Sequence, residues 1–308
     1  MTSPRPTAPE LPARLARHLG AFERRVVEVE GLRLHVMEAG AAGNPAAPVA
    51  LLVHGNPTWG FLWRKVAGAL AGTGLRVVMP DLPGLGLSEK PRDPSWHTLE
   101  RHAAVLRGLV RSLGNAPVVL AVHDWGGPIG VLAMSGLADR LAGLVVTNTV
   151  LRPPRDGHRP TAFHRFANLP GVAELAFHWL GFPQNLLQRT QADPDSISGD
   201  VAFAYRWPLR DRADRAAPLA LARMVPTGGA HPSLEGLRTV EAFTGAFAGP
   251  AAIVWADQDP ILARALKRNQ ELLPRASVIT VPAGHYLQEE APVPIADAIR
   301  EVARKAIR

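Results

Sequence analysis

The sequence predicts an α/β protein in which a mostly parallel central sheet has helices on both faces and carries an inserted helical cap. Six short apolar runs, bounded by turn residues, recur along the chain, as is typical of strands buried on both faces. Helix-like segments such as 99–113 and 129–137 separate these runs, and this alternation indicates a parallel sheet. The alternation stops between about residues 153 and 226, where helix formers dominate.

The first two strands are expected to form a β-hairpin. Residues 24–30 and 32–38 carry alternating patterns on either side of Gly31, which indicates two paired strands joined by a tight turn. The six buried strands are then expected at 49–54, 75–80, 118–123, 141–148, 251–256 and 277–282.

Length and composition fit one large domain with an insertion. The chain has 308 residues, of which 47% are hydrophobic and 20% charged, enough for a sizeable core. We expect the core to comprise 21–152 and 227–308, the helical cap 153–226, and a flexible tail 1–20 rich in proline and arginine. Such a cap would cover the carboxyl ends of the strands, where open α/β sheets bind ligands.

Charge and composition argue against several classes of partner. The net charge is +7, but only four of the 34 basic residues are lysine and no basic run occurs, so we expect neither nucleic-acid nor membrane binding. The sequence contains no apolar run of about 18 residues and its first residues lack the apolar core of a secretory signal, which favours a cytoplasmic protein. The absence of cysteine excludes disulfides, thiolate metal sites and cysteine nucleophiles.

Residues 121–130, AVHDWGGPIG, place an aspartate between a predicted strand and a helix. In a nucleophile elbow, a sharp turn flanked by small residues exposes one reactive side chain. Asp124 occupies that position, followed by Trp125 and two glycines, although Val122 stands where the strict pattern has glycine. The structural alternative is an aspartate that only caps the following helix.

A second turn follows the predicted strand at 49–54, in the motif HGNPTW. In hydrolases of this architecture, one N–H from this loop and the N–H after the nucleophile form an oxyanion hole. The backbone amides of Asn56 and Trp125 are therefore the candidates. His54 is expected to brace the loop.

The segments WADQDPIL and PAGHYLQEEAP each follow a predicted strand. Asp257 or Asp259 could supply a carboxylate, and His285 an imidazole. Asp259 is preferred because it precedes a proline at the start of the next helix, where its side chain would point back over the sheet edge. The order Asp124, Asp259, His285 is the nucleophile, acid, histidine order of an α/β-hydrolase triad.

Together these segments resemble the haloalkane dehalogenase family of the α/β-hydrolase fold. The resemblance rests on the motifs HGNPTW, PDLPGLGLSEKP, HDWGG, WADQDP and AGHYLQEEAP and covers nearly everything from residue 22 onwards. It implies hydrolysis of a halogenated alkane to an alcohol, a halide and a proton, with no metal or organic cofactor. It also implies that the side chains of Asn56 and Trp125 bind the halide.

The residue types suit this chemistry. An ordinary aspartate, with a pKa of about 3.9, is ionised at neutral pH, so Asp124 could attack a saturated carbon without a base and form an alkyl ester. His285 would then activate water against the ester, while Asp259 holds the imidazole. A halide leaves without a proton and needs only N–H donors, which the Trp125 indole and the Asn56 amide carry.

Two features vary among the proteins that this chain resembles. Some take the acid from a glutamate after the strand that follows the nucleophile, but here that stretch has Thr149 and no acid, so Asp259 is expected to serve. Others use a cap tryptophan in place of the asparagine. Asn56 is present here, while Trp179 and Trp207 leave a cap contribution open.

Competing interpretations differ at single positions. An epoxide hydrolase shares the aspartate nucleophile but uses two cap tyrosines, and only Tyr205 lies in the predicted cap, since Tyr286 follows the histidine. A fluoroacetate dehalogenase would have an arginine in place of Trp125, and an esterase a serine in place of Asp124. A non-catalytic ligand-binding protein of this fold would usually lack a triad member, whereas all three candidates are present.

Overall fold

The computed structural model describes residues 8–41, 44–155, 157 and 161–307. Eight strands form one sheet in the order β1-β2-β4-β3-β5-β6-β7-β8. The first two pairings, β1 with β2 and β2 with β4, are antiparallel, and all later pairings are parallel. The predicted hairpin and the predicted mostly parallel sheet are therefore confirmed.

Each strand lies within one or two residues of its predicted bounds. The strands are β1 (Glu23–Val29), β2 (Leu32–Gly40), β3 (Val49–Val53), β4 (Arg76–Pro80), β5 (Val118–His123), β6 (Leu141–Thr147), β7 (Ala251–Ala256) and β8 (Ser277–Val281).

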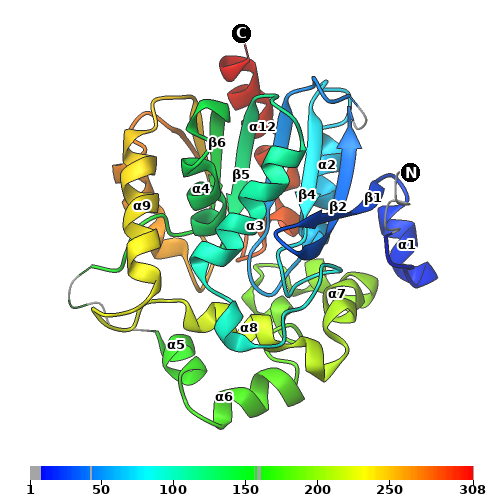
Figure 1. Cartoon of the computed structure of the whole chain (residues 1–308), viewed down its shortest axis with the longest axis vertical. Coiled ribbons are helices and arrows are strands. Elements are labelled where there is room, and N and C mark those ends of the chain that lie inside the picture. The colour runs from blue at the N-terminus through cyan, green and yellow to red at the C-terminus, as the bar shows by residue number, and fades with distance from the viewer. Residues whose placement is uncertain (1–7, 42–43, 156, 158–160, 308) are drawn as a thin grey trace.

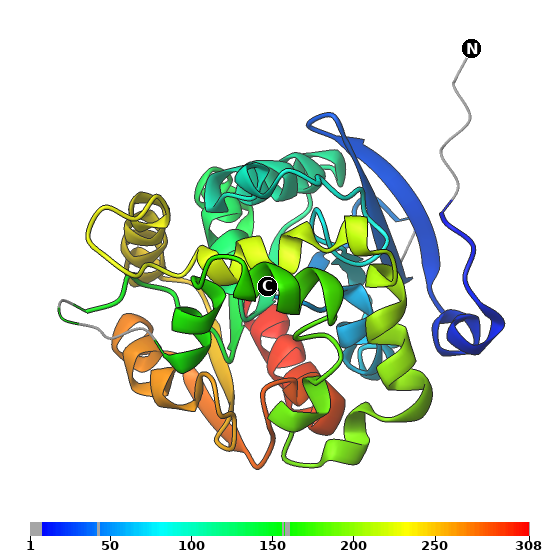
Figure 2. The ribbon, with the colours of Figure 1, turned by 90° about the horizontal axis from the view of Figure 1, so that it is seen from below.

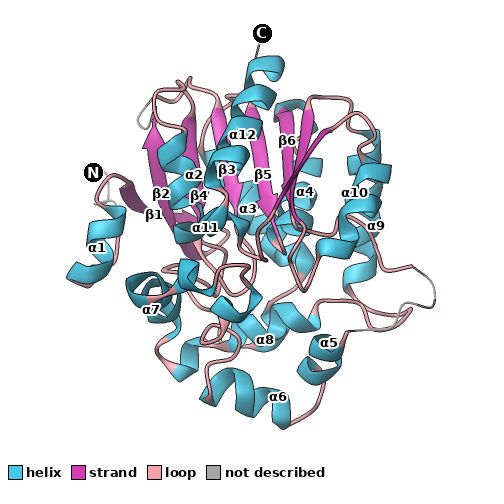
Figure 3. Ribbon diagram, turned by 180° about the vertical axis from the view of Figure 1, so that it is seen from behind, coloured by secondary structure: helices cyan, strands magenta, loops and turns pink. Residues whose placement is uncertain are grey.

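The α-helices in the described part of the chain fall into two layers and a cap. They are α1 (Ala13–Leu19), α2 (Arg64–Ala69), α3 (Leu99–Ser112), α4 (Gly126–Ser135), α5 (Ala162–Ala167), α6 (Val172–Glu174), α7 (Gly199–Arg206), α8 (Ala216–Arg223), α9 (Ser233–Ala246), α10 (Leu266–Leu272), α11 (Leu287–Glu290) and α12 (Pro292–Ala306). Helices α3, α4 and α9 cover the face of the sheet seen in Figure 1, and α2, α11 and α12 cover the face seen in Figure 3.

Successive residues of the central strands point into different cores. In β5, Leu120 and Val122 pack in the apolar cluster that includes α3 and α4, whereas Val119 and Ala121 pack with α2 and α12. Burial on both faces explains why these strands are continuous apolar runs in the sequence, without the alternation of a half-exposed strand.

Helix α3 shows how local sequence sets an element. The Thr98 hydroxyl accepts the backbone N–H of Arg101 at 3.2 Å and caps the helix, which satisfies one of the N–H groups that a helix start leaves unpaired. Apolar residues at helical spacing, including Leu99, Leu106 and Leu109, then bury one face against the sheet.

Helices α5 to α8, which we call the cap helices, lie between β6 and α9 in the chain. They form a separate layer beyond one end of the sheet in Figure 1 and spread across that end in Figure 2. Asn56 and Trp59, which follow β3, donate hydrogen bonds to carbonyl oxygens of Pro218 in α8 and Ala204 in α7. The cap helices therefore contact the carboxyl end of the sheet.

The N-terminal region contains more structure than the predicted flexible tail. Residues 1–7 lie outside the described residues, but α1 is a helix whose Leu15 and Leu19 are buried. Arg14 and Arg17 on the same helix form ion pairs with Asp200 of α7. A proline- and arginine-rich composition suggested a loose segment, whereas the two leucines at i and i+4 supply an apolar face that docks.

None of the helices in the described part of the chain combines the length and the apolarity needed to cross a membrane.

Candidate active site

Asp124 lies in the turn between β5 and α4 with a backbone φ of 49°. Non-glycine residues seldom adopt this left-handed conformation, which persists only where the surroundings hold it. Here the Asp124 N–H donates to the Asn148 carbonyl at 3.1 Å, and the Thr149 hydroxyl donates to the Asp124 carbonyl at 2.5 Å. The end of β6 thus fixes the turn that presents the carboxylate.

Three glycines around this turn leave no room for a side chain. A Cβ on Gly126 would lie 2.3 Å from a carbonyl oxygen of β3, and one on Gly127 would lie 2.0 Å from the Thr149 hydroxyl. A Cβ on Gly55 would lie 2.3 Å from Oδ1 of Asp124. The glycines of the motifs HDWGG and HGN are therefore required by close packing against the nucleophile turn.

The three predicted triad residues come together at the carboxyl end of the sheet. His285 Nδ1 lies 2.9 Å from Oδ2 of Asp259, and His285 Nε2 lies 3.9 Å from Oδ2 of Asp124. Asp259 is buried, while Asp257 is exposed, so the preferred carboxylate is the one that reaches the histidine. The imidazole lies between two carboxylates, hydrogen-bonded to one and separated from the other.

Asp259 and His285 shift each other's pKa values in opposite directions. Burial acts to raise the pKa of Asp259, but the charge and hydrogen bond of His285, with donors from Ile261 and Asn148, lower that pKa to about 2. Burial acts to lower the pKa of His285, yet the carboxylates of Asp259 and Asp124 raise it above its ordinary value. Asp259 therefore stays ionised and favours the imidazolium form of His285.

The carboxylate of Asp124 is held by backbone donors. The Asn56 N–H donates to Oδ1 at 2.8 Å, and the Trp125 N–H lies near enough to the carboxylate to lower its pKa. Burial raises the pKa of Asp124, while the charge of His285 and these two N–H groups oppose that rise. Both N–H groups predicted to form an oxyanion hole thus lie at the nucleophile.

The side-chain donors expected to bind a halide differ in their engagement. One N–H of the Asn56 amide donates to the Pro218 carbonyl at 2.9 Å, and its Oδ1 is buried without a partner. Among the described residues, no hydrogen bond is formed by the indole N–H of Trp125, and the residue is 8% exposed. The indole N–H of Trp125 and the second amide N–H of Asn56 are therefore without a hydrogen-bond partner in the described part of the chain.

Asn148 is a site residue that motif reasoning missed. Its amide donates to the Ala256 carbonyl at 3.1 Å and to Oδ2 of Asp259 at 2.7 Å, and its Oδ1 accepts the Ala256 N–H at 2.8 Å. Its own carbonyl accepts the Asp124 N–H. Asn148 thereby joins the nucleophile turn to the acid, and the available signal was an amide at the carboxyl end of a buried strand.

His54 braces the loop after β3, as expected. Its Nδ1 lies 2.9 Å from the Gly55 carbonyl, and its Nε2 accepts the Leu82 N–H at 2.9 Å. Burial lowers its pKa, which fits a neutral imidazole with one donor and one acceptor.

Sequence and structure comparisons place the chain among known proteins. Residues 48–292 match the family model described as alpha/beta hydrolase fold. The haloalkane dehalogenase of Mycobacterium marinum is 30% identical over 271 residues, which cover 87% of this chain and 88% of that protein. The chain belongs to the haloalkane dehalogenase family.

Further comparisons agree with this membership. Haloalkane dehalogenase 2 of Mycobacterium bovis is 32% identical over 290 residues, covering 91% of this chain and 94% of that protein. The crystal structure of haloalkane dehalogenase DatA from Agrobacterium tumefaciens has a TM-score of 0.81 at 25% identity, covering 94% of this chain and 99% of that one. The fold class and the family predicted from the motifs are both confirmed.

The two cap tryptophans that the sequence left open as halide donors each pack against an arginine. Trp179 is 60% exposed with the Arg212 guanidinium over its ring, and Trp207 has Arg210 over its ring. The Tyr205 hydroxyl donates to Glu289 at 2.6 Å. Since this phenol is already bonded to a carboxylate, it does not favour an epoxide hydrolase.

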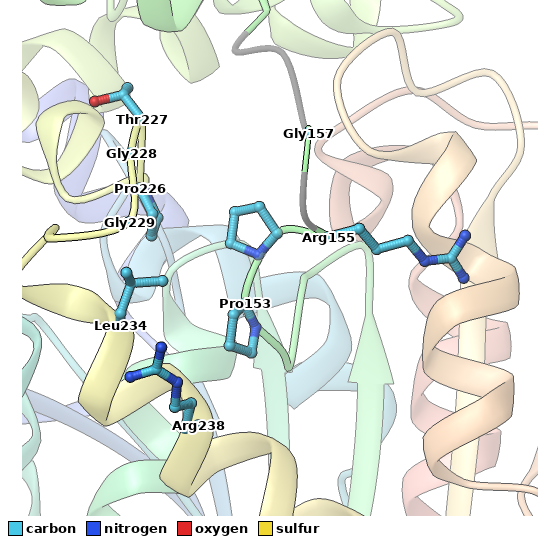
Figure 4. Close-up of a pocket in the computed structure, with 10 residues that line it drawn as sticks. Pro153, Arg155, Gly157, Pro226, Thr227, Gly228, Gly229, Leu234 and Arg238 are labelled. Atoms are coloured by element: carbon cyan, nitrogen blue, oxygen red, sulfur yellow. The ribbon is translucent and has the colours of Figure 1, made fainter.

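A pocket of about 280 Å³ lies elsewhere on the dehalogenase, between the two connections of the cap helices to the core. Figure 4 shows residues of both connections around it, including Pro153, Arg155 and Thr227. Arg155 forms an ion pair with Glu271 of α10. None of the five predicted site residues lines this pocket. Among the described residues, no group of three or more His, Cys, Asp or Glu side chains is arranged to hold a metal ion.

Proposed function

We propose that this dehalogenase hydrolyses halogenated alkanes to an alcohol, a halide and a proton through an alkyl ester on Asp124. The observation that carries the proposal is the position of the Asp124 carboxylate. Its Oδ1 accepts a backbone N–H at 2.8 Å, and its Oδ2 lies 3.9 Å from the Nε2 of a histidine that is paired with a second carboxylate.

The first step forms the ester. Oδ2 of Asp124 attacks the carbon that bears the halogen, and the carbon–halogen bond breaks as the carbon–oxygen bond forms. The halide takes the bonding electron pair and needs no proton. The indole N–H of Trp125 and the second amide N–H of Asn56 stabilise it.

The second step returns the carboxylate. Neutral His285 takes a proton from a water molecule that attacks the carboxyl carbon of the ester. Negative charge develops on Oδ1, which already faces the N–H of Asn56, so the stabilising donors need little rearrangement. The intermediate expels the alcohol, which receives its proton from His285, and Asp124 then loses a proton to regenerate the carboxylate.

Asp259 controls the protonation of His285. Asp259 stabilises the imidazolium that forms during ester hydrolysis. The raised pKa of His285 also means that the histidine must lose its proton before it can act as a base, which sets an acid limit to turnover.

We propose that the partners of this chain are a small halogenated alkane and a halide ion, with neither nucleic acid nor a membrane, and that the protein acts in the cytoplasm. Fractionation of cells that produce the protein tests the location.

The reaction is tested by incubating the purified chain with 1-bromobutane, 1,2-dibromoethane and longer bromo- and chloroalkanes and measuring released halide. Asp124→Asn should abolish halide release while leaving the circular dichroism spectrum unchanged. A ligand-binding protein without catalytic function would release no halide and would bind its ligand equally well after this substitution. Absence of turnover across the panel would overturn the function and leave the fold intact.

A further inference from the structure

The loop that carries His285 forms backbone hydrogen bonds to the cap segment, residues 190–193, in addition to its bonds to the core. The His285 N–H donates to the Thr190 carbonyl at 2.8 Å. The loop lies between β8 and α11, and the N–H groups of His285 and Tyr286 are bonded neither to a strand nor to a helix of the core. Since buried backbone groups must find partners, the cap segment satisfies what the core alone leaves open.

Gln191 makes the most specific of these contacts. Its Oε1 accepts the Tyr286 N–H at 2.9 Å, and its Nε2 lies 3.2 Å from the Tyr286 carbonyl and 3.1 Å from the Ser196 hydroxyl. One side-chain amide thus holds both polar groups of the residue that follows the catalytic histidine. Gln191 is 9% exposed, so water competes little for these bonds.

The contact is close as well as polar. A Cβ on Gly284 would lie 2.3 Å from the Thr190 carbonyl oxygen and 2.4 Å from the Cα of Gln191. The Glu290 carboxylate adds a second bridge, since it accepts the N–H of Asp193 and the N–H of Gly284, both at 2.6 Å. The glycine in the motif AGHY is therefore a further point of close contact between the cap segment and the histidine loop.

The core also contacts the backbone of His285, through His123 at the end of β5. Nε2 of His123 lies 2.8 Å from the His285 carbonyl. The main chain is thus held at His285 by Thr190 and His123, and at Tyr286 by Gln191. The imidazole ring must lie between Asp259 and Asp124, and errors of about 1 Å in such arrangements can cost about 10²-fold in rate.

We propose that Gln191 is a positioning residue that holds His285 in register with Asp259 and Asp124, so that the cap segment supplies part of the base's orientation. The proposal rests on the proposed function for its kinetic consequence. Its structural consequence, the geometry of the Asp259–His285 bond, can be measured without any turnover.

The test is Gln191→Met, which keeps the length of the side chain and removes both bonds to Tyr286. Loss of register should slow ester hydrolysis about tenfold or more and leave the first step, which does not use His285, unchanged. Rapid mixing with 1-bromobutane should then show a burst of bromide, with the ester visible as added mass on the protein.

The second readout is the NMR titration of the His285 imidazole, assigned with His285→Gln. The titratable groups around this ring are Asp259, Asp124, His123 and Tyr286. Asp259 raises the pKa of His285, so a weakened bond should move the midpoint in Gln191→Met to lower pH. A contact that only stabilises the fold would leave the midpoint where it is.

Gln184→Met is the matched control. Gln184 is also buried in the cap, and its amide faces the carbonyl groups of Gly181 and Phe182 in the cap itself. The same chemical change there should lower the free energy of unfolding without moving the His285 midpoint or the ratio of burst to steady-state rate.

If Gln191→Met does not fold, Gln191→Asn shortens the same amide by one methylene and should shift the midpoint in the same direction. A wild-type midpoint and an unchanged ratio of burst to steady-state rate in either folded variant would overturn the proposal. If the wild-type chain releases no halide, the proposed function fails, while the titration still decides the positioning role.

Discussion

Asp124 and His285 act on different bonds, and their separation follows that division. The 3.9 Å between Oδ2 and Nε2 is too long for a hydrogen bond, unlike the contact that a serine nucleophile needs with its base. A carboxylate is already ionised and requires no proton transfer to attack. The histidine is needed only when water attacks the ester.

Replacing His285 should therefore stop the cycle halfway. In His285→Gln we expect about one equivalent of halide per protein molecule and no further turnover, because the ester forms and persists. Quenched-flow halide measurement and intact-protein mass spectrometry check this. If His285→Gln released no first equivalent of halide either, the assignment of His285 to the second step would be contradicted.

The indole N–H of Trp125 is expected to stabilise the leaving halide, so it should affect the first step and not the second. Trp125→Phe keeps most of the ring and removes the donor, so we expect the rate of ester formation to fall about 10²-fold, the usual effect of losing one preorganised donor. The measurement is single-turnover halide release. Trp207→Phe is the control, since that indole lies under Arg210 in the cap, and its rate should match the wild type.

The site residues that lie in recognisable motifs could be predicted from the sequence. Asp124, Asp259 and His285 follow strands in a recognisable order, and the structure brings them together. Asn148 and Gln191 could not be assigned in this way, because their partners are distant in the sequence. Gln191 binds the backbone of Tyr286, 95 positions away, and Asn148 binds the side chain of Asp259, 111 positions away. Nothing in their local sequence specifies such a partner.

At the scale of elements, turn chemistry misled the prediction in one place. Helix α4 begins at Gly126, three residues before the expected start at Ile129. Glycines usually indicate a turn, but here Gly126 and Gly127 are helical and are required by the carbonyl of β3 and the hydroxyl of Thr149. Tertiary packing, which no local pattern records, outweighs the helix propensity of these residues.

The buried carboxylate of Glu289 ties three elements together. It accepts from Arg64 of α2 through both guanidinium nitrogens and from Tyr205 of α7 at 2.6 Å, and its side chain is fully buried. Helix α11, which carries Glu289, is thus joined to the core and to the cap helices at one point.

Glu289→Gln should destabilise the fold by about 3–5 kcal/mol, because it leaves the buried Arg64 guanidinium without its counter-charge. Chemical denaturation at neutral pH measures the change. Glu301→Gln, which removes exposed ion pairs with Arg304 and Lys305, should leave the unfolding free energy unchanged. Equal effects of the two substitutions would contradict the role assigned to Glu289.

For the whole molecule, the pair of Asp259 and His285 should make the free energy of unfolding depend on pH. Asp259 has a pKa of about 2 in the folded protein and about 3.9 when unfolded, a difference worth about 2–3 kcal/mol. Its contribution is complete above the unfolded pKa and is lost as pH falls toward about 2. The raised pKa of His285 has the opposite sign, so its contribution is lost as pH rises through that value.

We therefore expect the contribution of this pair to the unfolding free energy to be largest between about pH 4 and the raised pKa of His285. In Asp259→Asn both slopes should flatten, because the two groups no longer pair. Urea unfolding across a pH series checks this. A profile for Asp259→Asn that runs parallel to the wild type would show that other groups control the pH dependence.

The two chain connections around the pocket of Figure 4 have a consequence for engineering. Because both connections line one pocket, we expect that the intervening segment can be exchanged without altering the sheet connectivity. A graft would nevertheless need more than matching ends. It must bring an amide for the peptide after His285 and a phenol for Glu289, so compatibility between donor and scaffold can be screened at two positions before any library is built.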